Sequence, residues 1–289
     1  MTPEELSGLR LDAQKCAGHL RLSLRERNWQ GAQGNWAGAG IGSSIDFQDH
    51  RPYMPGDDPR YIDWAAYARS GQTIMKLYRE EVSPRMDLVL DSSQSMFFDS
   101  EKEAQTLRLF FFCIESALAI SASLRIYLLS ENHLELLSVE QALNLDKFRT
   151  SEKAESGIPS LGKLPFRNNA MRLFISDLLY DSPPDPLLAT LVAQRGKGVI
   201  LAPYLEKEQN PEWSGNMELV ECETGLRRRQ RVDPALLYRY KKTYANHLSS
   251  WDESCRKYQV QFARVPCEGG LAQGLETEAL SKGVVETWG

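Results

Sequence analysis

An alternation of strand-like and helix-like segments, beginning after Pro84, constrains the fold of this chain more than any other feature. Five apolar runs have the length of strands, and amphipathic stretches such as 101–123, 186–195 and 234–257 separate most of them. The runs are MDLVLD, LRIYLLS, MRLFISDLL, VILAPYL and YQVQFARV. Strands that alternate with helices favour a parallel sheet covered on both faces. We therefore expect a doubly wound, mainly parallel α/β domain of Rossmann-like type over residues 82–289.

Two hairpins are expected within this domain. The segment LRIYLLSENHLELLSV predicts a tight turn about Glu131 and Asn132, which would place one antiparallel strand at an edge of the sheet. A second hairpin is expected around Glu223, Thr224 and Gly225.

The first 81 residues have a different texture. Apolar residues recur at helical spacing from Leu6 to about Trp29, and 31–42 is rich in glycine and alanine. Residues 43–81 are dense in Asp, Arg, Tyr and Pro, with little periodicity, so we interpret this segment as ordered, and either irregular or short-stranded. We expect a helical and irregular N-terminal module over residues 1–81, packed on the α/β domain.

Composition excludes several classes of protein. The net charge of -5, from 39 acidic and 34 basic residues, disfavours a nucleic-acid partner. The five cysteines form no CxxC pair, and the N-terminus lacks the apolar core of a signal peptide. Leu107 to Leu129 is apolar, but charged residues interrupt it, so we expect a buried helix and a strand instead of a membrane span. These features predict a cytoplasmic protein.

Oxygen-bearing side chains follow two of the expected strands. Asp91, Ser93 and Ser95 come directly after MDLVLD, and Asp177 ends MRLFISD. Parallel sheets build ligand sites at the carboxyl ends of their strands. Because hard cations prefer oxygen ligands, the sequence predicts a site for Mg²⁺, or for Mn²⁺ or Ca²⁺, if the two strands are neighbours.

The pattern Asp-x-Ser-x-Ser at Asp91, Ser93 and Ser95 resembles the metal-ion-dependent adhesion site of von Willebrand factor A-type domains. This resemblance implies a von Willebrand factor A-like fold, and it assigns Asp177 as the aspartate that follows the fourth strand. A threonine completes the shell in that family. Pro159 stands at its place here, with Ser160 beside it, so the resemblance implies a site that binds metal weakly or only with a ligand present.

Two other interpretations of the serine loop stay open. Ser93 or Ser95 could cap the helix that follows, without any metal. Alternatively, Asp91 could be the nucleophile of a phosphohydrolase, as in aspartyl-phosphate enzymes. Haloacid dehalogenase-like sites of that kind carry a second carboxylate two residues later, where this chain has Ser93.

A longer motif precedes the serine loop. It comprises Gly40-Ile41-Gly42, Asp46-Phe47, the run RPYMPGDDPRYIDW over 51–64, and Ala68-Arg69-Ser70-Gly71. These residues resemble the hallmark of the bacterial family called domain of unknown function 58. The resemblance implies a protein that acts with a MoxR-type AAA+ ATPase in a chaperone-like role, and it singles out Arg51, Tyr53, Gly56, Asp57, Asp58, Arg60, Asp63, Trp64 and Arg69.

The hallmark combines turn-forming residues with charges of both signs. One interpretation is a lattice of ion pairs between Arg51, Arg60 and Arg69 and the nearby aspartates. The other is a docking surface for a partner protein, with Trp64 and Tyr53 as its anchors.

Together these features predict a non-catalytic, metal-dependent protein-binding protein. The alternatives are a metal-independent scaffold that binds through 51–69 and, third, the phosphohydrolase.

Overall fold

The computed structural model describes residues 1–23, 45–80, 84–129, 134–144, 162, 164–222 and 224–288, with the backbone alone at 45–49 and 77–80. The chain divides into two compact units. One comprises Met1–Leu24 and Pro84–Gly289, and the other comprises Arg25–Ser83.

A six-stranded sheet forms the centre of the larger unit. Its strand order is β11-β8-β7-β4-β5-β6, and every pair is parallel except β5 with β6. The strands are β4 (Arg85–Asp91), β5 (Ser123–Leu129), β6 (Leu134–Leu137), β7 (Met171–Ile175), β8 (Lys197–Tyr204) and β11 (Gln261–Pro266). The predicted α/β class, the mainly parallel sheet and the antiparallel edge strand are confirmed.

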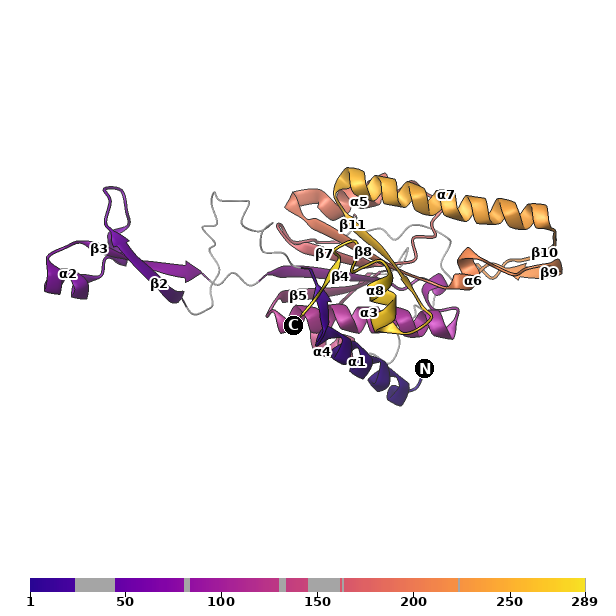
Figure 1. Ribbon diagram of the computed structural model, residues 1–289, viewed down its shortest axis with the longest axis horizontal. Helices are drawn as coiled ribbons and strands as arrows, with labels where there is room; N and C mark the ends of the chain where they lie inside the picture. Colours follow the sequence, from indigo (N-terminus) through magenta and orange to yellow (C-terminus); the bar gives the residue numbers. More distant parts are fainter. Residues whose placement is uncertain are drawn as a thin grey trace. The chain divides into compact units, whose positions relative to one another are not determined.

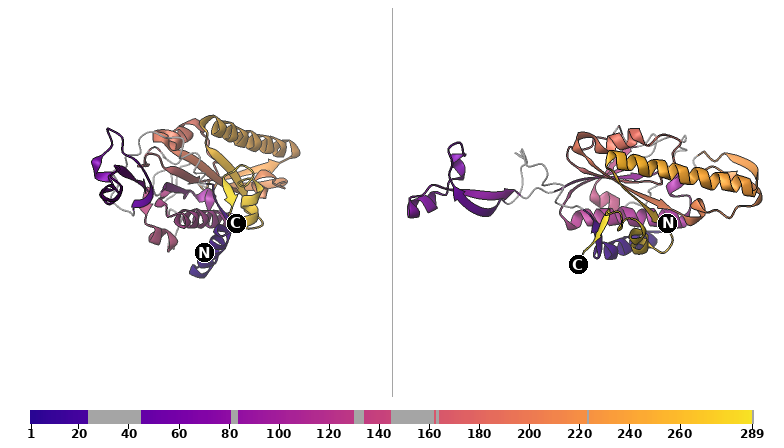
Figure 2. Two further views of the ribbon diagram at one scale, coloured as in Figure 1. Left: turned by 60° about the vertical axis from the view of Figure 1, so that its left-hand side comes forward. Right: turned by 45° about the horizontal axis from the view of Figure 1, so that its top comes forward.

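Helices cover both faces of this sheet (Figure 1). One face packs against α3 (Ser100–Ala119), α4 (Val139–Leu143) and α8 (Leu271–Thr277), and α1 (Pro3–Ala17) packs on α3 within the same core. The other face packs against α5 (Asp185–Val192) and α7 (Pro234–Tyr258), and Figure 2 shows the same two layers from further sides. Successive side chains of a strand point to opposite faces, so Leu88 and Leu90 join the first core while Val89 joins the second.

The apolar run from Leu107 is a buried helix followed by a strand, as expected. Helix α3 has the buried side chains Leu109, Phe110 and Phe111, and β5 continues to Leu129. In the parts of the chain that the structure describes, no helix has both the length and the apolar character of a membrane span.

The first residues of the chain pack within the α/β unit. Helix α1 packs on α3, where Gln14 Nε2 donates to Glu115 Oε1 at 2.9 Å. Strand β1 (Leu20–Leu22) pairs with β12 (Val285–Thr287) near the other end of the chain. Residues 1–24 therefore belong with the α/β unit and not with the predicted module of residues 1–81. Local pattern could not reveal this, because the partners of both elements lie far away in the sequence.

A second hairpin lies outside the central sheet. Strands β9 (Gly215–Val220) and β10 (Arg227–Val232) pair antiparallel, which confirms the hairpin expected around Thr224. The short helix α6 (Glu206–Gln209) connects β8 to this hairpin.

The smaller unit has ordered secondary structure of its own. Strands β2 (Ile45–Pro52) and β3 (Ile74–Glu80) form an antiparallel pair, and the 3₁₀ helix η2 (Pro59–Tyr61) and helix α2 (Trp64–Ser70) lie in the connection. Helix α2 ends at Gly71, whose φ of 69° is the left-handed conformation that glycine tolerates best. The expectation of an ordered, short-stranded segment is confirmed for residues 45–80.

Candidate functional site

The carboxyl ends of two neighbouring strands form the candidate site. Strands β4 and β7 pair in parallel, with Leu90 opposite Ile175, so Asp91 and Asp177 emerge at the same edge of the sheet. The chain order reverses here, because β5 and β6 lie on one side of β4 while β7, β8 and β11 lie on the other. Doubly wound sheets bind their ligands at such a point. The adjacency on which the predicted site depends is therefore present.

Asp91 is fully buried, and both of its oxygens accept hydrogen bonds. Oδ1 accepts the backbone N–H of Ser93 at 3.0 Å, and Oδ2 accepts the hydroxyls of Ser176, at 2.8 Å, and of Tyr180. Burial, and after it the negative charge of Asp177, raise the pKa of Asp91 to about 6. A cation beside this carboxylate would favour its ionised form and so counteract both the burial and the charge of Asp177.

The serine turn leads from β4 into the 3₁₀ helix η3 (Gln94–Met96). The hydroxyl oxygens of Ser93 and Ser95 lie 3.1 Å apart, and both residues are partly exposed. Ser93 makes no capping hydrogen bond, and the next long helix, α3, is capped by Asp99, which accepts the N–H of Glu101 at 2.9 Å. Ser93 thus holds the N-cap position of η3 without a side-chain capping bond, and neither serine caps α3.

Asp177 is paired with a buried lysine. Lys102 Nζ donates to Asp177 Oδ2 and to Glu208 Oε1, both at 2.8 Å, and the Lys102 side chain is 0% exposed. Burial by itself would lower the pKa of Lys102, but the charges of Asp177 and Glu208 outweigh it and hold that pKa above its usual value. Lys102 is thus a charged ammonium beside the predicted metal ligands.

Of the predicted metal ligands, the strand pairing brings Asp91 and Asp177 to one edge, with Ser93 and Ser95 in the turn that follows Asp91. Ser160 lies outside the described residues.

The hallmark residues form specific contacts within the smaller unit. Arg51 and Asp57 make a two-pronged ion pair in which both N···O distances are 2.7 Å, and Asp57 also accepts the N–H of Met54 at 2.9 Å. Arg60 pairs with Asp58 at 2.6 Å. Gly56, in the turn that leads into Asp57, has a φ of 106°.

Asp63 and Arg69 do not join such a lattice. Asp63 caps α2 by accepting the N–H groups of Ala65 and Ala66 at 3.0 Å, and it lies 3.1 Å from His50 Nε2. The Asp63 pKa is lowered to about 2, first by the hydrogen bond from Ala66. Arg69 donates to the carbonyl of Ala65 at 3.2 Å. Only two of the expected ion pairs therefore form, Arg51 with Asp57 and Arg60 with Asp58. The side chains of Asp63 and Arg69 instead hydrogen-bond to the backbone of α2.

Large apolar side chains of the smaller unit are exposed around α2. Trp64 is 62% exposed, and it meets the ring of Tyr67 edge-on at 6.1 Å. Met54, Tyr61 and Tyr67 are also exposed, whereas Tyr53 is partly buried and donates its N–H to Thr73. Trp64 therefore fits the predicted role of an anchor better than Tyr53 does.

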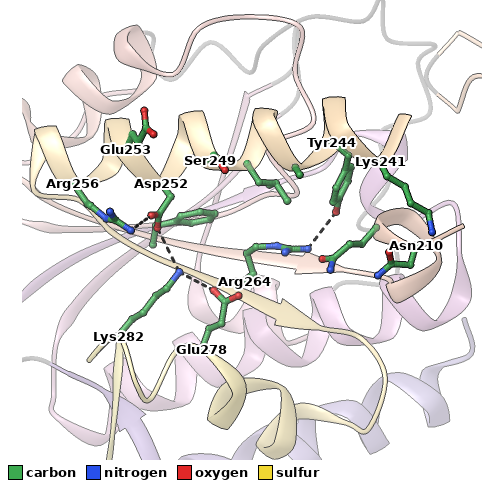
Figure 3. A pocket seen from close by; sticks show the side chains of 14 residues that line it. Asn210, Lys241, Tyr244, Ser249, Asp252, Glu253, Arg256, Arg264, Glu278 and Lys282 are labelled. Carbon is green, nitrogen blue, oxygen red and sulfur yellow. Dashed lines mark hydrogen bonds and ion pairs between the residues drawn. The ribbon is translucent and has the colours of Figure 1, made fainter. Parts of the chain in front are cut away.

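A separate open cleft of about 670 Å³ lies beside α7 and β11 (Figure 3). Lys282 lies 2.8 Å from Glu278 and 3.6 Å from Asp252, and Arg264 donates to the Tyr244 hydroxyl at 3.4 Å. Asp252 and Glu278 thus share Lys282, and Asp252 also pairs with Arg256 of the same cleft. This surface pairing contrasts with the buried charges at the carboxyl edge.

Four further residues belong to the site and were not predicted from the sequence, namely Lys102, Ser176, Tyr180 and Glu208. Lys102 carries a recognisable signal, because it lies at helical spacing with Gln105, Thr106 and Leu109 on the buried face of α3. A charged residue on an otherwise buried helical face indicates a buried partner. Ser176, Tyr180 and Glu208 carry no comparable signal, since only the tertiary structure brings them to Asp91 and Lys102.

Comparison with known proteins gives one match. The model of a family described as protein of unknown function DUF58 matches residues 49–132, which include most of the hallmark, β4, the serine turn and α3. This match supports the resemblance to that family. No curated protein and no solved structure matches the chain.

Proposed function

We propose that the chain is a non-catalytic adaptor that binds a partner protein through a divalent metal at the carboxyl edge of its sheet. The parallel pairing of β4 with β7 carries this proposal, because it brings Asp91 and Asp177 together beside the hydroxyls of Ser93 and Ser95. The metal would be Mg²⁺, or Mn²⁺ or Ca²⁺.

The donor chemistry fits such an ion. Asp91 Oδ1 and the hydroxyls of Ser93 and Ser95 are hard oxygen ligands, which small divalent cations prefer. A nearby cation would stabilise the ionised form of Asp91, which burial and the charge of Asp177 disfavour. A bound metal would supply Lewis acidity and an open position, to which the partner contributes a carboxylate.

The strand order supports a von Willebrand factor A-like assignment within the α/β class. Numbered along the chain within the six-stranded sheet, the strands read 3-2-1-4-5-6 from β6 to β11. This is an order of doubly wound folds, whose ligand crevice lies between strands 1 and 4. Here those strands are β4 and β7.

A phosphohydrolase is less well supported. A nucleophilic carboxylate must reach its substrate, whereas Asp91 is 0% exposed and its Oδ2 accepts two hydroxyl hydrogen bonds. These contacts favour a ligand or structural role for Asp91.

Thermal unfolding with chelator and with millimolar Mg²⁺ or Mn²⁺ tests the metal site. A ligand that binds only the folded state stabilises it by RT ln(1 + [L]/Kd), about 2.7 kcal/mol at a hundredfold excess over Kd. The wild type should show the metal-dependent rise, and so should the control Asp185→Ala, which alters a carboxylate whose side chain is 43% exposed and pairs with Lys257. Asp91→Asn should lose it, and a rise that persists in this variant would contradict the proposal.

The partner follows from the family resemblance, which implies a MoxR-type AAA+ ATPase. Co-purification from native lysate should recover such an ATPase in Mg²⁺, and chelator or Asp91→Asn should reduce its recovery. Recovery of no AAA+ ATPase in either condition would contradict this partner.

A metal-independent scaffold is the second candidate, and the exposed Trp64, Met54 and Tyr61 of the smaller unit favour it. In that case Trp64→Ala should abolish partner recovery, while chelator and Asp91→Asn should leave it unchanged.

A further inference from the structure

Three charged side chains meet beneath the carboxyl edge of the sheet. Lys102 lies in the first turn of α3, which Asp99 caps. Its ammonium donates to both Asp177 and Glu208, at 2.8 Å to each. The side chains of Lys102, Asp177 and Glu208 are 0%, 3% and 12% exposed. The two carboxylates thus form a binding site for a cation, and the ammonium of Lys102 occupies it.

The two carboxylates are held by different means. Asp177 Oδ1 accepts the N–H of Leu179 at 3.2 Å, so its Oδ2 is the oxygen that Lys102 occupies. Glu208 Oε2 accepts the N–H of Leu205 at 2.9 Å and keeps Oε1 toward the ammonium. Glu208 can therefore remain the partner of Lys102 when Asp177 is withdrawn.

We propose that the Lys102 ammonium competes with the divalent metal for Asp177 and thereby sets the metal affinity of the carboxyl edge. This inference rests on the proposed function. A metal held by Asp91 and the serines would share the carboxyl edge with Asp177, and it would repel the Lys102 ammonium strongly where water is excluded. Before the metal can bind Asp177, Lys102 must therefore give up this carboxylate and pair with Glu208 alone. The flexible four-carbon side chain of lysine permits such a shift.

The competition explains how a partner would control the site. Without a partner, Lys102 neutralises Asp177 and the metal is held weakly. A carboxylate contributed by the partner adds negative charge at the metal, which favours the metal over the ammonium. Metal and partner therefore bind with positive coupling.

The test measures Mn²⁺ binding by isothermal titration calorimetry on the full chain. Lys102→Met alone leaves two buried carboxylates unpaired, so the main variant is the double substitution Lys102→Met with Glu208→Gln. It removes one positive and one negative charge, which leaves the net charge of the cluster unchanged and frees Asp177. We expect its Kd for Mn²⁺ to be at least about tenfold lower than that of the wild type.

Three matched variants separate competition from general electrostatics. Glu208→Gln alone leaves the ammonium to Asp177 and should weaken Mn²⁺ binding. Adding Asp177→Asn to the double variant should abolish the gain. Lys207→Met removes a neighbouring exposed ammonium that pairs with Asp99, and it should leave the Kd within about twofold.

The outcomes distinguish this inference from the proposed function. A folded double variant that binds Mn²⁺ no more tightly than a metal-binding wild type overturns the competition and leaves the metal site intact. If none of the folded proteins binds Mn²⁺, the proposed function fails and the competition fails with it.

Discussion

The carboxyl edge of the sheet and the hallmark segment of the smaller unit both pair a basic side chain with an aspartate, but in opposite environments. The Lys102 side chain is 0% exposed beside Asp177, whereas the Arg60 side chain is 84% exposed beside Asp58. Breaking a buried pair leaves a charge without water or partner, while an exposed pair exchanges its partner for solvent at little cost. We therefore expect the carboxyl edge to affect stability and metal binding, and the hallmark segment to affect partner binding.

The largest expected effect is a loss of stability when the buried ion pair at the carboxyl edge is broken. Lys102→Met should lower the free energy of unfolding by about 3–5 kcal/mol, because Asp177 and Glu208 lose their buried cation. Lys207→Met, which breaks the exposed pair with Asp99, should cost about 0–1 kcal/mol. Urea unfolding measures both. Equal costs in the two variants would remove the distinction between the buried and the exposed ion pair.

The second effect is a pH dependence in the absence of metal. Asp91 has a pKa of about 6 in the folded state against 3.8 for the unperturbed group, so folding favours its protonated form. This contribution to stability is fully present below pH 3.8 and is lost as pH rises through 6.

Asp91→Asn cannot ionise, so its unfolding free energy should gain about 3 kcal/mol relative to wild type between pH 4 and 7. Ser93→Ala keeps the Asp91 carboxyl and should keep the wild-type pH dependence. Unfolding in chelator across this range provides the measurement. A constant difference between Asp91→Asn and wild type would show that the buried charge is already compensated.

A smaller, local effect is expected in the hallmark segment. Asp63→Ala removes the cap of α2, and the amides of Ala65 and Ala66 should exchange with solvent about fivefold faster. Asp63→Asn keeps a capping oxygen and should preserve most of the protection. Hydrogen exchange resolved by residue measures this effect. Equal loss in both variants would assign the role of Asp63 to its charge, which lies 3.1 Å from His50 Nε2 and 3.7 Å from Lys76 Nζ.

The smallest expected effect on stability is that of Trp64→Ala. Because Trp64 is 62% exposed, the change in unfolding free energy should stay within about 0.5 kcal/mol. The same variant should reduce recovery of a partner if the hallmark segment is a docking surface. A marked loss of stability would instead show that Trp64 packs within the protein.

Local pattern was sufficient for the sheet and for the position of the serine turn. The apolar runs of MDLVLD and of α3 predicted elements that the structure contains, because the pattern of apolar residues is local to each element. The pattern failed for residues 1–24. The partners of α1 and β1, which are α3 and β12, lie about 100 and 260 residues away along the chain.

The sequence by itself determined that Asp91, Ser93, Ser95 and Asp177 stand at strand ends, since the strands and their limits follow from local periodicity. Only the tertiary structure decided that β4 and β7 are neighbours, that Tyr180 and Ser176 hydrogen-bond Asp91, and that Lys102 lies between Asp177 and Glu208. The physical reason is burial, because the free energy of a charged group depends on the water and on the interaction partners around it. Segments separated by 75 and 106 residues supply those partners here.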